Sequence, residues 1–409
     1  MVRAWHLSIV IPPFQLSYES AMPIVNRLAE LHAEITQWRR EIHQHPELMY
    51  DVERTAGFVE GKLGEFGCDQ VVPGIGRTGV VGLIRGNRPG PTIGLRADMD
   101  ALPILEETGK DWASKTPGKM HACGHDGHTS MLLGAAKYLC ETRNFAGSVA
   151  VIFQPAEEGG AGADAMVKDG MMERFDITEV FGMHNLPGLP VGEFATNPGP
   201  IMASVDVFEI EITGKGGHAA FPHQSIDPIL VGSAIVMGAQ SLVARTLDPL
   251  ESGVVSITCF NAGTVDNVIP ETAKLVGTIR ALKPEVRMHL EERLLHLVKA
   301  TASAHGAQAT VDYQRLYPPT VNHGEHTDIA VEVARDVAGD PALVNPDAVP
   351  MLGGEDFSFM LNSRPGNFIF MGNGDTAGLH HPRYDFNDEA IPHGTSYWVR
   401  LVEKRLALS

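Results

Sequence analysis

Hydrophobic positions in residues 23–199 alternate between two spacings. Helical spacing over residues 23–45 puts apolar side chains on one stripe, and Pro46 ends this predicted helix. Helices are also predicted over residues 55–66, which Gly67 closes, and over residues 127–140. Short apolar runs predict strands at 80–84, 92–95, 147–153 and 180–183, the last ending at His184. This alternation predicts an α/β domain with a largely parallel sheet.

The pattern changes after Gly199-Pro200. Strands are predicted at 205–212, 253–260, 273–282 and 308–313, and helices at 227–245 and 284–305. Their order, βαββαβ, is that of a ferredoxin-like unit. A strand at 367–371 then resumes the first pattern. We therefore predict a larger α/β domain with a mixed, largely parallel sheet, made of residues 23–199 and 316–409. A smaller ferredoxin-like domain, residues 200–315, is inserted into it.

Composition narrows the classes of partner. Apolar residues make up 44% and charged residues 20% of 409 positions, which is ordinary for a globular protein and long enough for two domains. A formal net charge of −18 argues against nucleic acid and against an anionic membrane, because both need a basic face. No uninterrupted apolar run reaches membrane-spanning length. The four cysteines are scattered, which predicts a reducing compartment, the cytoplasm, and no disulfide framework.

Residues 1–22 do not fit either domain. The apolar run at residues 7–11 is broken at once by Pro12 and Pro13, so it is too short for an ordinary signal peptide. We interpret this segment as a disordered leader or as an over-called start, with Met22 as the true beginning. A short export signal is the alternative.

Residues that bind metals recur in order along the larger domain, each near the end of an apolar run. They form the motifs His121-Ala-Cys-Gly-His-Asp-Gly-His128, Pro155-Ala-Glu-Glu-Gly159, Gly182-Met-His-Asn185 and Leu379-His-His-Pro382. A thiol, imidazoles and carboxylates suit zinc or a neighbouring transition metal and suit calcium or magnesium poorly. The donors exceed what one tetrahedral ion needs, which indicates a two-metal, hydrolytic site. The larger domain is therefore the predicted catalytic one.

Two close pairs carry most of this chemistry. Cys123 and His125, in a turn that contains glycine, can face one site; taken alone, they would be a buried cysteine near a surface histidine. Asp126 is placed to orient a ligand imidazole. Glu157 and Glu158 follow a predicted buried strand, and the alternative for them is a solvated acidic turn. Beside metal ions, one glutamate can bind metal while the other acts as a general base.

Single polar residues at other turns complete the candidate site. His184 and either His380 or His381 would be structural if taken alone, and become ligands when taken with the other motifs. Asp98 and Asp100 come after the strand at 92–95, where functional side chains of α/β sheets tend to lie.

The inserted domain offers contact residues of a different kind. Lys215-Gly-Gly-His218 combines glycines with a histidine, as in a mobile contact loop. Asn267 and Arg280 belong to the same domain, and arginine is the natural partner of a substrate carboxylate. Spacing alone leaves open that Arg280 is a solvent-facing strand residue.

Taken together, these motifs resemble the aminoacylase/carboxypeptidase superfamily of co-catalytic metallohydrolases. More narrowly, the chain resembles its amidohydrolase branch, which includes hippurate hydrolases, N-acyl-amino-acid deacylases and auxin-conjugate hydrolases. The likeness covers nearly all of the chain after residue 22. It also rests on the segments Trp38–Glu47, Arg96–Pro103, Gly214–His218 and Asn267–Pro270.

The resemblance implies two divalent metal ions per subunit, either zinc or manganese, cobalt or nickel. It implies five ligands and a general base, namely Cys123, His125, Glu158, His184 and His380, with Glu157 as the base. It also implies that the inserted domain is a lid and dimerisation domain, in a homodimer or a tetramer. His218 would then reach the active site of a second subunit, and Asn267 and Arg280 would engage the substrate.

One departure within the superfamily is informative. Peptidase branches carry a His-x-Asp motif after an early strand, and this chain has Asp98-x-Asp100 there instead. The resemblance therefore favours hydrolysis of small amide conjugates over peptide trimming. We expect both aspartates to support the metal ligands from a second layer of residues.

These expectations lead to a functional hypothesis: hydrolysis of N-acyl amino acids to a carboxylic acid and a free amino acid. A dipeptidase or carboxypeptidase using the same site is one alternative. A metal-dependent binding protein without catalysis is another, although the intact Glu157 counts against it. A structural zinc site is disfavoured because its ligands would lie close in sequence.

Overall fold

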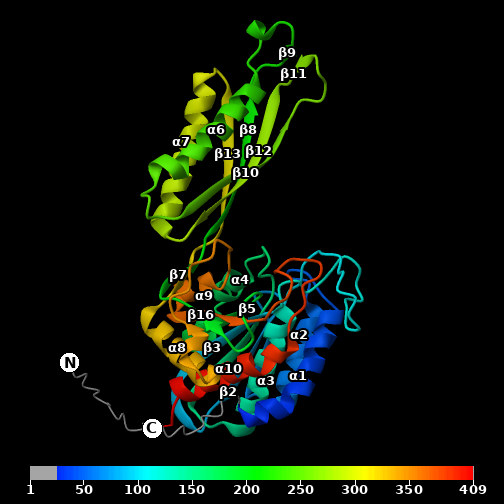
Figure 1. The fold of residues 1–409 in the computed structure, drawn as a ribbon, viewed down its shortest axis with the longest axis vertical. Coiled ribbons are helices and arrows are strands. Elements are labelled where there is room, and N and C mark those ends of the chain that lie inside the picture. The colour runs from blue at the N-terminus through cyan, green and yellow to red at the C-terminus, as the bar shows by residue number, and fades with distance from the viewer. Residues whose placement is uncertain (1–24, 409) are drawn as a thin grey trace, which may run out of the picture.

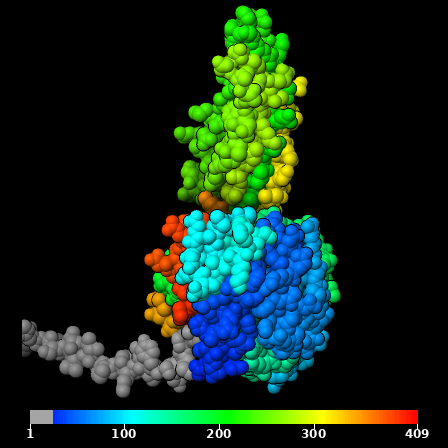
Figure 2. Space-filling view, turned by 90° about the vertical axis from the view of Figure 1, so that its right-hand side faces the viewer, coloured from blue at the N-terminus to red at the C-terminus, as the bar shows by residue number. Residues whose placement is uncertain are grey.

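The structure, a computed structural model, describes residues 25–408 and has two lobes joined by a narrow waist (Figures 1 and 2). The lower lobe contains both ends of the described chain. The upper lobe stands on one end of it and is formed by the middle of the chain. The predicted leader, residues 1–22 with Met22, lies outside the described residues.

The lower lobe is built on an eight-stranded sheet with the order β1-β2-β4-β3-β5-β16-β6-β15. Its centre is parallel, since β3 pairs in parallel with β4 and β5, and β5 with β16. Antiparallel pairs flank this centre, which makes the sheet mixed and largely parallel, as predicted. The strands are β1 (Gln70–Ile75), β2 (Gly79–Arg85), β3 (Arg88–Asp98), β4 (Ala146–Gln154), β5 (Ile177–Leu186), β6 (Phe194–Ala195), β15 (Val344–Asn345) and β16 (Gly366–Gly372).

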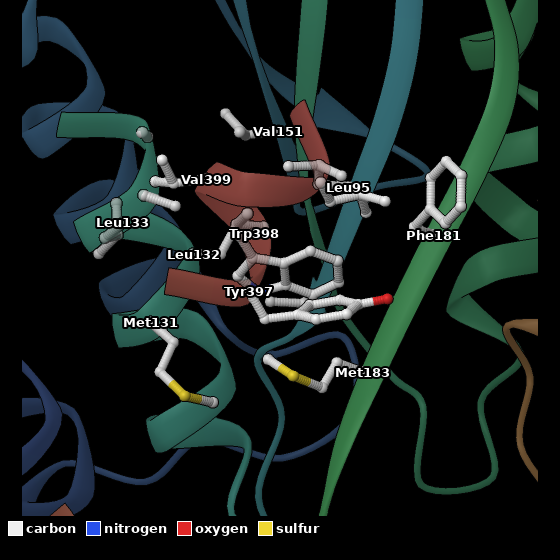
Figure 3. Close-up of a cluster of buried hydrophobic side chains, with 14 of the residues drawn as sticks. Leu95, Met131, Leu132, Leu133, Val151, Phe181, Met183, Tyr397, Trp398 and Val399 are labelled. Carbon is white, nitrogen blue, oxygen red and sulfur yellow. The ribbon is translucent and has the colours of Figure 1, made fainter. Parts of the chain in front are cut away.

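Helices cover both faces of this sheet, and each face has its own hydrophobic cluster. Alternate residues of β4 serve the two sides: Val149 and Val151 face one cluster, and Ala150 and Ile152 face the other. The first cluster lies under α1 (Asn26–Gln44), α2 (Glu53–Phe66), α3 (His125–Thr142), α8 (Gly324–Ala338) and α10 (Ile391–Arg405). The second lies under α4 (Gly162–Lys168), α5 (Met171–Arg174) and α9 (Ser358–Ser363). Figure 3 shows the first cluster, where Trp398 and Tyr397 of α10 lie between α3 and the sheet.

The upper lobe has the predicted βαββαβ order. Its four strands form an antiparallel sheet in the order β10-β12-β8-β13, with α6 and α7 packed against it. The elements are β8 (Val205–Thr213), α6 (Pro228–Thr246), β10 (Gly253–Ala262), β12 (Thr272–Ala281), α7 (Pro284–Ala304) and β13 (Gln308–Tyr317). A small ribbon of β9 (Gly217–His218) and β11 (Val268–Ile269) lies at the end farthest from the lower lobe (Figure 1). Helix α6 is long and apolar enough to cross a membrane by length and composition alone, but one of its faces packs on this sheet.

Short elements complete the connections. They are the pair β7 (Gly199–Met202) and β14 (Thr320–Asn322), and the 3-10 turns η1 (Pro222–Gln224), η2 (Pro341–Leu343) and η3 (Asp388–Ala390). The prediction that the strand at 180–183 ends at His184 is wrong. Strand β5 continues to Leu186, because β16 pairs with it as far as Gly372. Helix α3 likewise begins at His125, two residues earlier than predicted.

Candidate metal centre

The candidate ligands meet at the carboxyl ends of the central parallel strands. Strand β3 ends at Asp98, and β4 leads into the turn that holds Glu157 and Glu158. His184 lies near the end of β5, and Cys123 lies two residues before the start of α3. Because parallel strands end at one edge of the sheet, motifs far apart in sequence converge there.

The five predicted ligands form overlapping groups. The ligand atoms of Cys123, His125 and His184 lie within 4.8 Å of one another, as do those of Cys123, Glu158 and His380. Cys123 Sγ is 3.4 Å from His184 Nε2, and Glu158 Oε1 is 3.3 Å from His380 Nε2. The donor set is one thiol, three imidazoles and a carboxylate, which fits zinc or a related transition metal.

The imidazoles are oriented by their second nitrogens. His125 Nδ1 lies 2.8 Å from the carbonyl oxygen of Asp100, which leaves its Nε2 buried without a hydrogen-bond partner. His184 Nδ1 lies 2.6 Å from the carbonyl oxygen of Asn185, so its Nε2 faces Cys123. A backbone acceptor on one ring nitrogen, with the other nitrogen free, is the usual arrangement for a metal-binding histidine. The unpartnered Nε2 of His125 therefore fits a bound cation.

His128 is close by, but both of its ring nitrogens already have hydrogen-bond partners. Its Nδ1 donates to Asp98 Oδ1 at 2.7 Å, and its Nε2 accepts the backbone N–H of Asn185 at 3.0 Å. Both ring nitrogens make these contacts, which hold Asp98 and the end of β5 in place.

Asp98 and Asp100 are buried beside the candidate ligands, and each makes hydrogen bonds of its own. Asp100 accepts the backbone N–H groups of Glu157 and Glu158 at 3.0 and 3.1 Å, which holds the two glutamates in their turn. Asp98 also pairs with the buried guanidinium of Arg96 at 2.7 Å. Burial alone would lower the pKa of His125, but Asp98 and Asp100 raise it to about 10. The site thus favours positive charge at the position of this ring.

The expectation for Asp126 needs correction. Its Oδ2 lies 2.8 Å from Nδ1 of His43, and Arg39 lies 3.6 Å away. Asp126 therefore connects α3 to α1, and the ring it orients is that of His43 on α1, which is not among the candidate ligands.

An acidic network that was not predicted from the sequence lies beside Glu157. Arg96 donates to Glu355 at 2.9 Å and to Asp356 at 3.0 Å, in addition to Asp98. Burial raises the pKa of Glu157 well above its usual range, and Glu355, Glu158 and Asp356 raise it further. A signal was present in the sequence: Arg96 stands inside an otherwise apolar strand, and a buried charge needs partners.

The candidate lid residues lie elsewhere in this chain. His218 and Asn267 belong to the β9–β11 ribbon, at the end of the upper lobe farthest from the metal centre (Figure 1). Arg280 is near the end of β12 next to the lower lobe, where its side chain bonds Thr278 and the carbonyl of Ile279. None of the three lines the cavity at the metal centre.

That cavity has a volume of about 400 Å³. Its floor holds Cys123, Glu157, Glu158, His184 and His380, and Tyr317 forms part of its wall. The Tyr317 hydroxyl donates to the carbonyl of Glu157 at 2.6 Å and accepts the N–H of Gly159 at 2.8 Å, so it braces the glutamate turn from the upper-lobe side.

Comparison with known proteins agrees with this geometry. Residues 94–404 match the sequence profile of peptidase family M20/M25/M40. The chain is 41% identical to a hippurate hydrolase of Campylobacter jejuni, over 94% of this chain and 100% of that one. It is 42% identical to thermostable carboxypeptidase 1 of Saccharolobus solfataricus, over 86% of this chain and 90% of that one. A Bacillus subtilis structure, described as a dinuclear metal binding peptidase from the M20 family, superposes with a TM-score of 0.81 at 36% identity, over 92% of this chain and 99% of that one.

Proposed function

The chain belongs to peptidase family M20/M25/M40 and is a hydrolase of amide bonds, and from this premise we propose that it cleaves N-acyl amino acids. The observation that carries the proposal is the convergence of Cys123, His125, Glu158, His184 and His380 beside a separate buried carboxyl, Glu157. A relative named hippurate hydrolase supports the substrate class, since hippurate is an N-acyl amino acid.

In this proposal the five ligands hold two divalent metal ions. When bound, such ions supply Lewis-acid activation of a water molecule and of the amide carbonyl. Zinc fits the thiolate, and manganese, cobalt or nickel fit the same donors. The roles proposed for the residues are the same whichever of these metals is bound.

Glu157 is the proposed general base and general acid. Its carboxyl lines the cavity next to Glu158, so it can take a proton from the attacking water and pass it to the leaving nitrogen. Burial and the neighbouring carboxyls raise its pKa, which increases its affinity for that proton. Glu158 differs because it faces His380 and Cys123 as a ligand.

The upper lobe would supply the groups that recognise the rest of the substrate. Arg280 and Asn267 would hold the substrate carboxylate. His218, presented by a second copy of the chain, would stabilise the developing oxyanion, a contact typically worth about 3 kcal/mol in the transition state. The position of the β9–β11 ribbon, away from the metal centre of its own chain, supports action between subunits of a homodimer (Figure 1). The described cysteines are free thiols, which supports a cytoplasmic location.

A carboxypeptidase acting through the same centre is the second candidate. It is favoured by the 42% identity to a protein named carboxypeptidase. The two candidates differ in substrate, since a carboxypeptidase removes an amino acid from a peptide and needs no foreign acyl group.

The deciding experiment measures amino-acid release from acetyl, benzoyl and indoleacetyl amino acids and from dipeptides. Each is run after chelation and after adding back zinc, manganese or cobalt. We expect metal-restored cleavage of the acyl amino acids. Cleavage of dipeptides alone would move the protein to the carboxypeptidase candidate.

Substitution of the proposed base gives the matching test of mechanism. Glu157→Gln keeps the shape of the side chain but removes its basicity, so turnover should fall by at least about a hundredfold. Bound metal, measured by elemental analysis, should stay unchanged because Glu157 is not a proposed ligand. Glu158→Gln is the matched control and should lose metal. Near-normal turnover in Glu157→Gln would disprove the assignment.

A further inference from the structure

The cavity at the metal centre has two unlike sides. One part of its lining consists of ligands and Glu157, and another part is apolar and includes Leu186, Met202, Met351 and Phe370, which we call the apolar side. No lysine or arginine lines this cavity in the described part of the chain. The apolar side thus offers nothing to neutralise a carboxylate, and it suits a nonpolar part of the substrate.

A second, separate hollow lies next to this apolar side. It has a volume of about 420 Å³ and is lined by apolar residues that include Leu189, Ala348 and Val349. Leu186, Met351 and Phe370 line both hollows, so these three side chains form the partition between them. The outer end is open to solvent, since Val349 is 85% exposed.

Met351 is the adaptable member of this partition. Its backbone is fixed, because its N–H donates to the carbonyl of Ile201 at 2.9 Å. Phe370 is held inside the central sheet by β16, whereas a methionine side chain has rotatable bonds that let it change shape to fit a neighbour. Movement of the Met351 thioether would join the two hollows into one apolar channel.

We propose that this channel receives the acyl group of the substrate, and that the enzyme prefers linear apolar acyl chains longer than acetyl, with Met351 as the specificity-determining residue. The inference rests on the proposed function, because an amide substrate has an acyl side only if the enzyme is a deacylase. The acyl side is chosen over the amino-acid side because the amino acid brings a carboxylate, and the apolar side of the cavity has no cationic side chain for it.

The test uses N-acyl derivatives of one amino acid, with chains from acetyl through butyryl and hexanoyl to decanoyl. For the wild-type enzyme, kcat/KM should rise by up to about fourfold for each methylene that enters the channel. Met351→Trp, which fills the partition, should lower the ratio of kcat/KM for decanoyl over acetyl at least tenfold. Met351→Ala, which opens the passage between the two hollows, should keep or raise that ratio.

Two controls make the outcome specific. Met288→Trp introduces the same bulk at a methionine that is 54% exposed on α7, and should leave the ratio unchanged. A second substrate series keeps the acyl group and varies the amino-acid side chain. If Met351→Trp changes selectivity in that series and not in the acyl series, the channel holds the amino acid and the inference is wrong.

The results also separate this inference from the proposed function. A flat response of the wild-type enzyme to chain length, with all acyl amino acids cleaved, would overturn the inference and leave the function standing. Failure to cleave any acyl amino acid, with dipeptides cleaved, would overturn the proposed function and the inference with it.

Discussion

Arg96 shows most directly how one residue supports the candidate site. It is fully buried and donates to Asp98, Glu355 and Asp356, whose negative charges would otherwise repel one another in a place that water does not reach. Removing such a residue should strongly destabilise the fold, since its partners are left as uncompensated buried charges.

We therefore predict that Arg96→Met destabilises the fold by about 3–5 kcal/mol. Urea unfolding followed by tryptophan fluorescence, in the presence of a chelator so that metal binding does not contribute, would measure this. Arg383→Met is the matched control: its side chain is 70% exposed and 3.9 Å from Glu107, so little change is expected. If the two variants lost similar amounts of unfolding free energy, the network around Arg96 would not be a special source of stability in the lower lobe.

The ligand residues were easier to predict than this network. Cys123 with His125, and Glu157 with Glu158, are neighbours in sequence and carry recognisable donor chemistry. Arg96 and Glu355 are separated by 259 positions, and their pairing depends on the order of strands in the sheet. Asp126 was misassigned for a related reason. Its nearness to His125 in sequence says nothing of the face of α3 that it occupies.

At the scale of elements, one glycine inside α2 and one at its end test the local rules of helix formation. Gly67 ends the helix with a left-handed backbone, φ 80°, while Gly61 lies inside the helix. A Cβ atom on either residue would meet nothing within 4 Å, so packing does not distinguish them. Only backbone conformation differs.

The same substitution should consequently have opposite effects at these two positions. Gly61→Ala should stabilise the protein by about 0.5–1 kcal/mol, because alanine loses less backbone entropy in a helix. Gly67→Ala should destabilise it by about 1 kcal/mol, because alanine disfavours the left-handed conformation. Urea unfolding of both variants against the wild type would check the two signs. If both substitutions changed the free energy of unfolding in the same direction, the end of the helix would have to rearrange in one of the variants.

Most long elements of both lobes were predicted from periodicity, but helices α8 and α10 and strand β1 were not, and neither were the short strands. Strands β6, β9, β11 and β15 each have two residues, too few for a hydrophobic period to appear. They exist because a neighbouring strand pairs with them, as β16 does with β6. Pairing also set the end of β5, which extends past His184 to Leu186 along β16. Tertiary contacts of this kind are absent from local sequence.

At the scale of the molecule, the upper lobe has apolar surface that residues 25–408 do not cover. Helix α6 buries one face on the sheet and leaves Met237 74% exposed, with Ile229 and Leu230 also exposed. Strand β10 is an edge of its sheet and exposes Phe260. An apolar helix beside an open strand edge is a surface that a second copy of the lobe can cover. The proposed homodimer would use this face.

Such a dimer predicts complementation between inactive variants. If His218 acts on the metal centre of the other subunit, a heterodimer of His218→Ala and Glu157→Gln chains contains one intact site, made of Glu157 from one chain and His218 from the other. Random mixing of the two variants should then restore about a quarter of wild-type activity, since half of the dimers are mixed and half of their sites are complete. Light scattering would verify that the protein is a dimer. Mass spectrometry of differently tagged chains would verify that the two variants have mixed. His223→Ala, an exposed histidine five positions along the same loop, should retain activity by itself. Verified heterodimers without recovered activity would place His218 in its own subunit's site, which would require the upper lobe to fold down from the position seen in Figure 1.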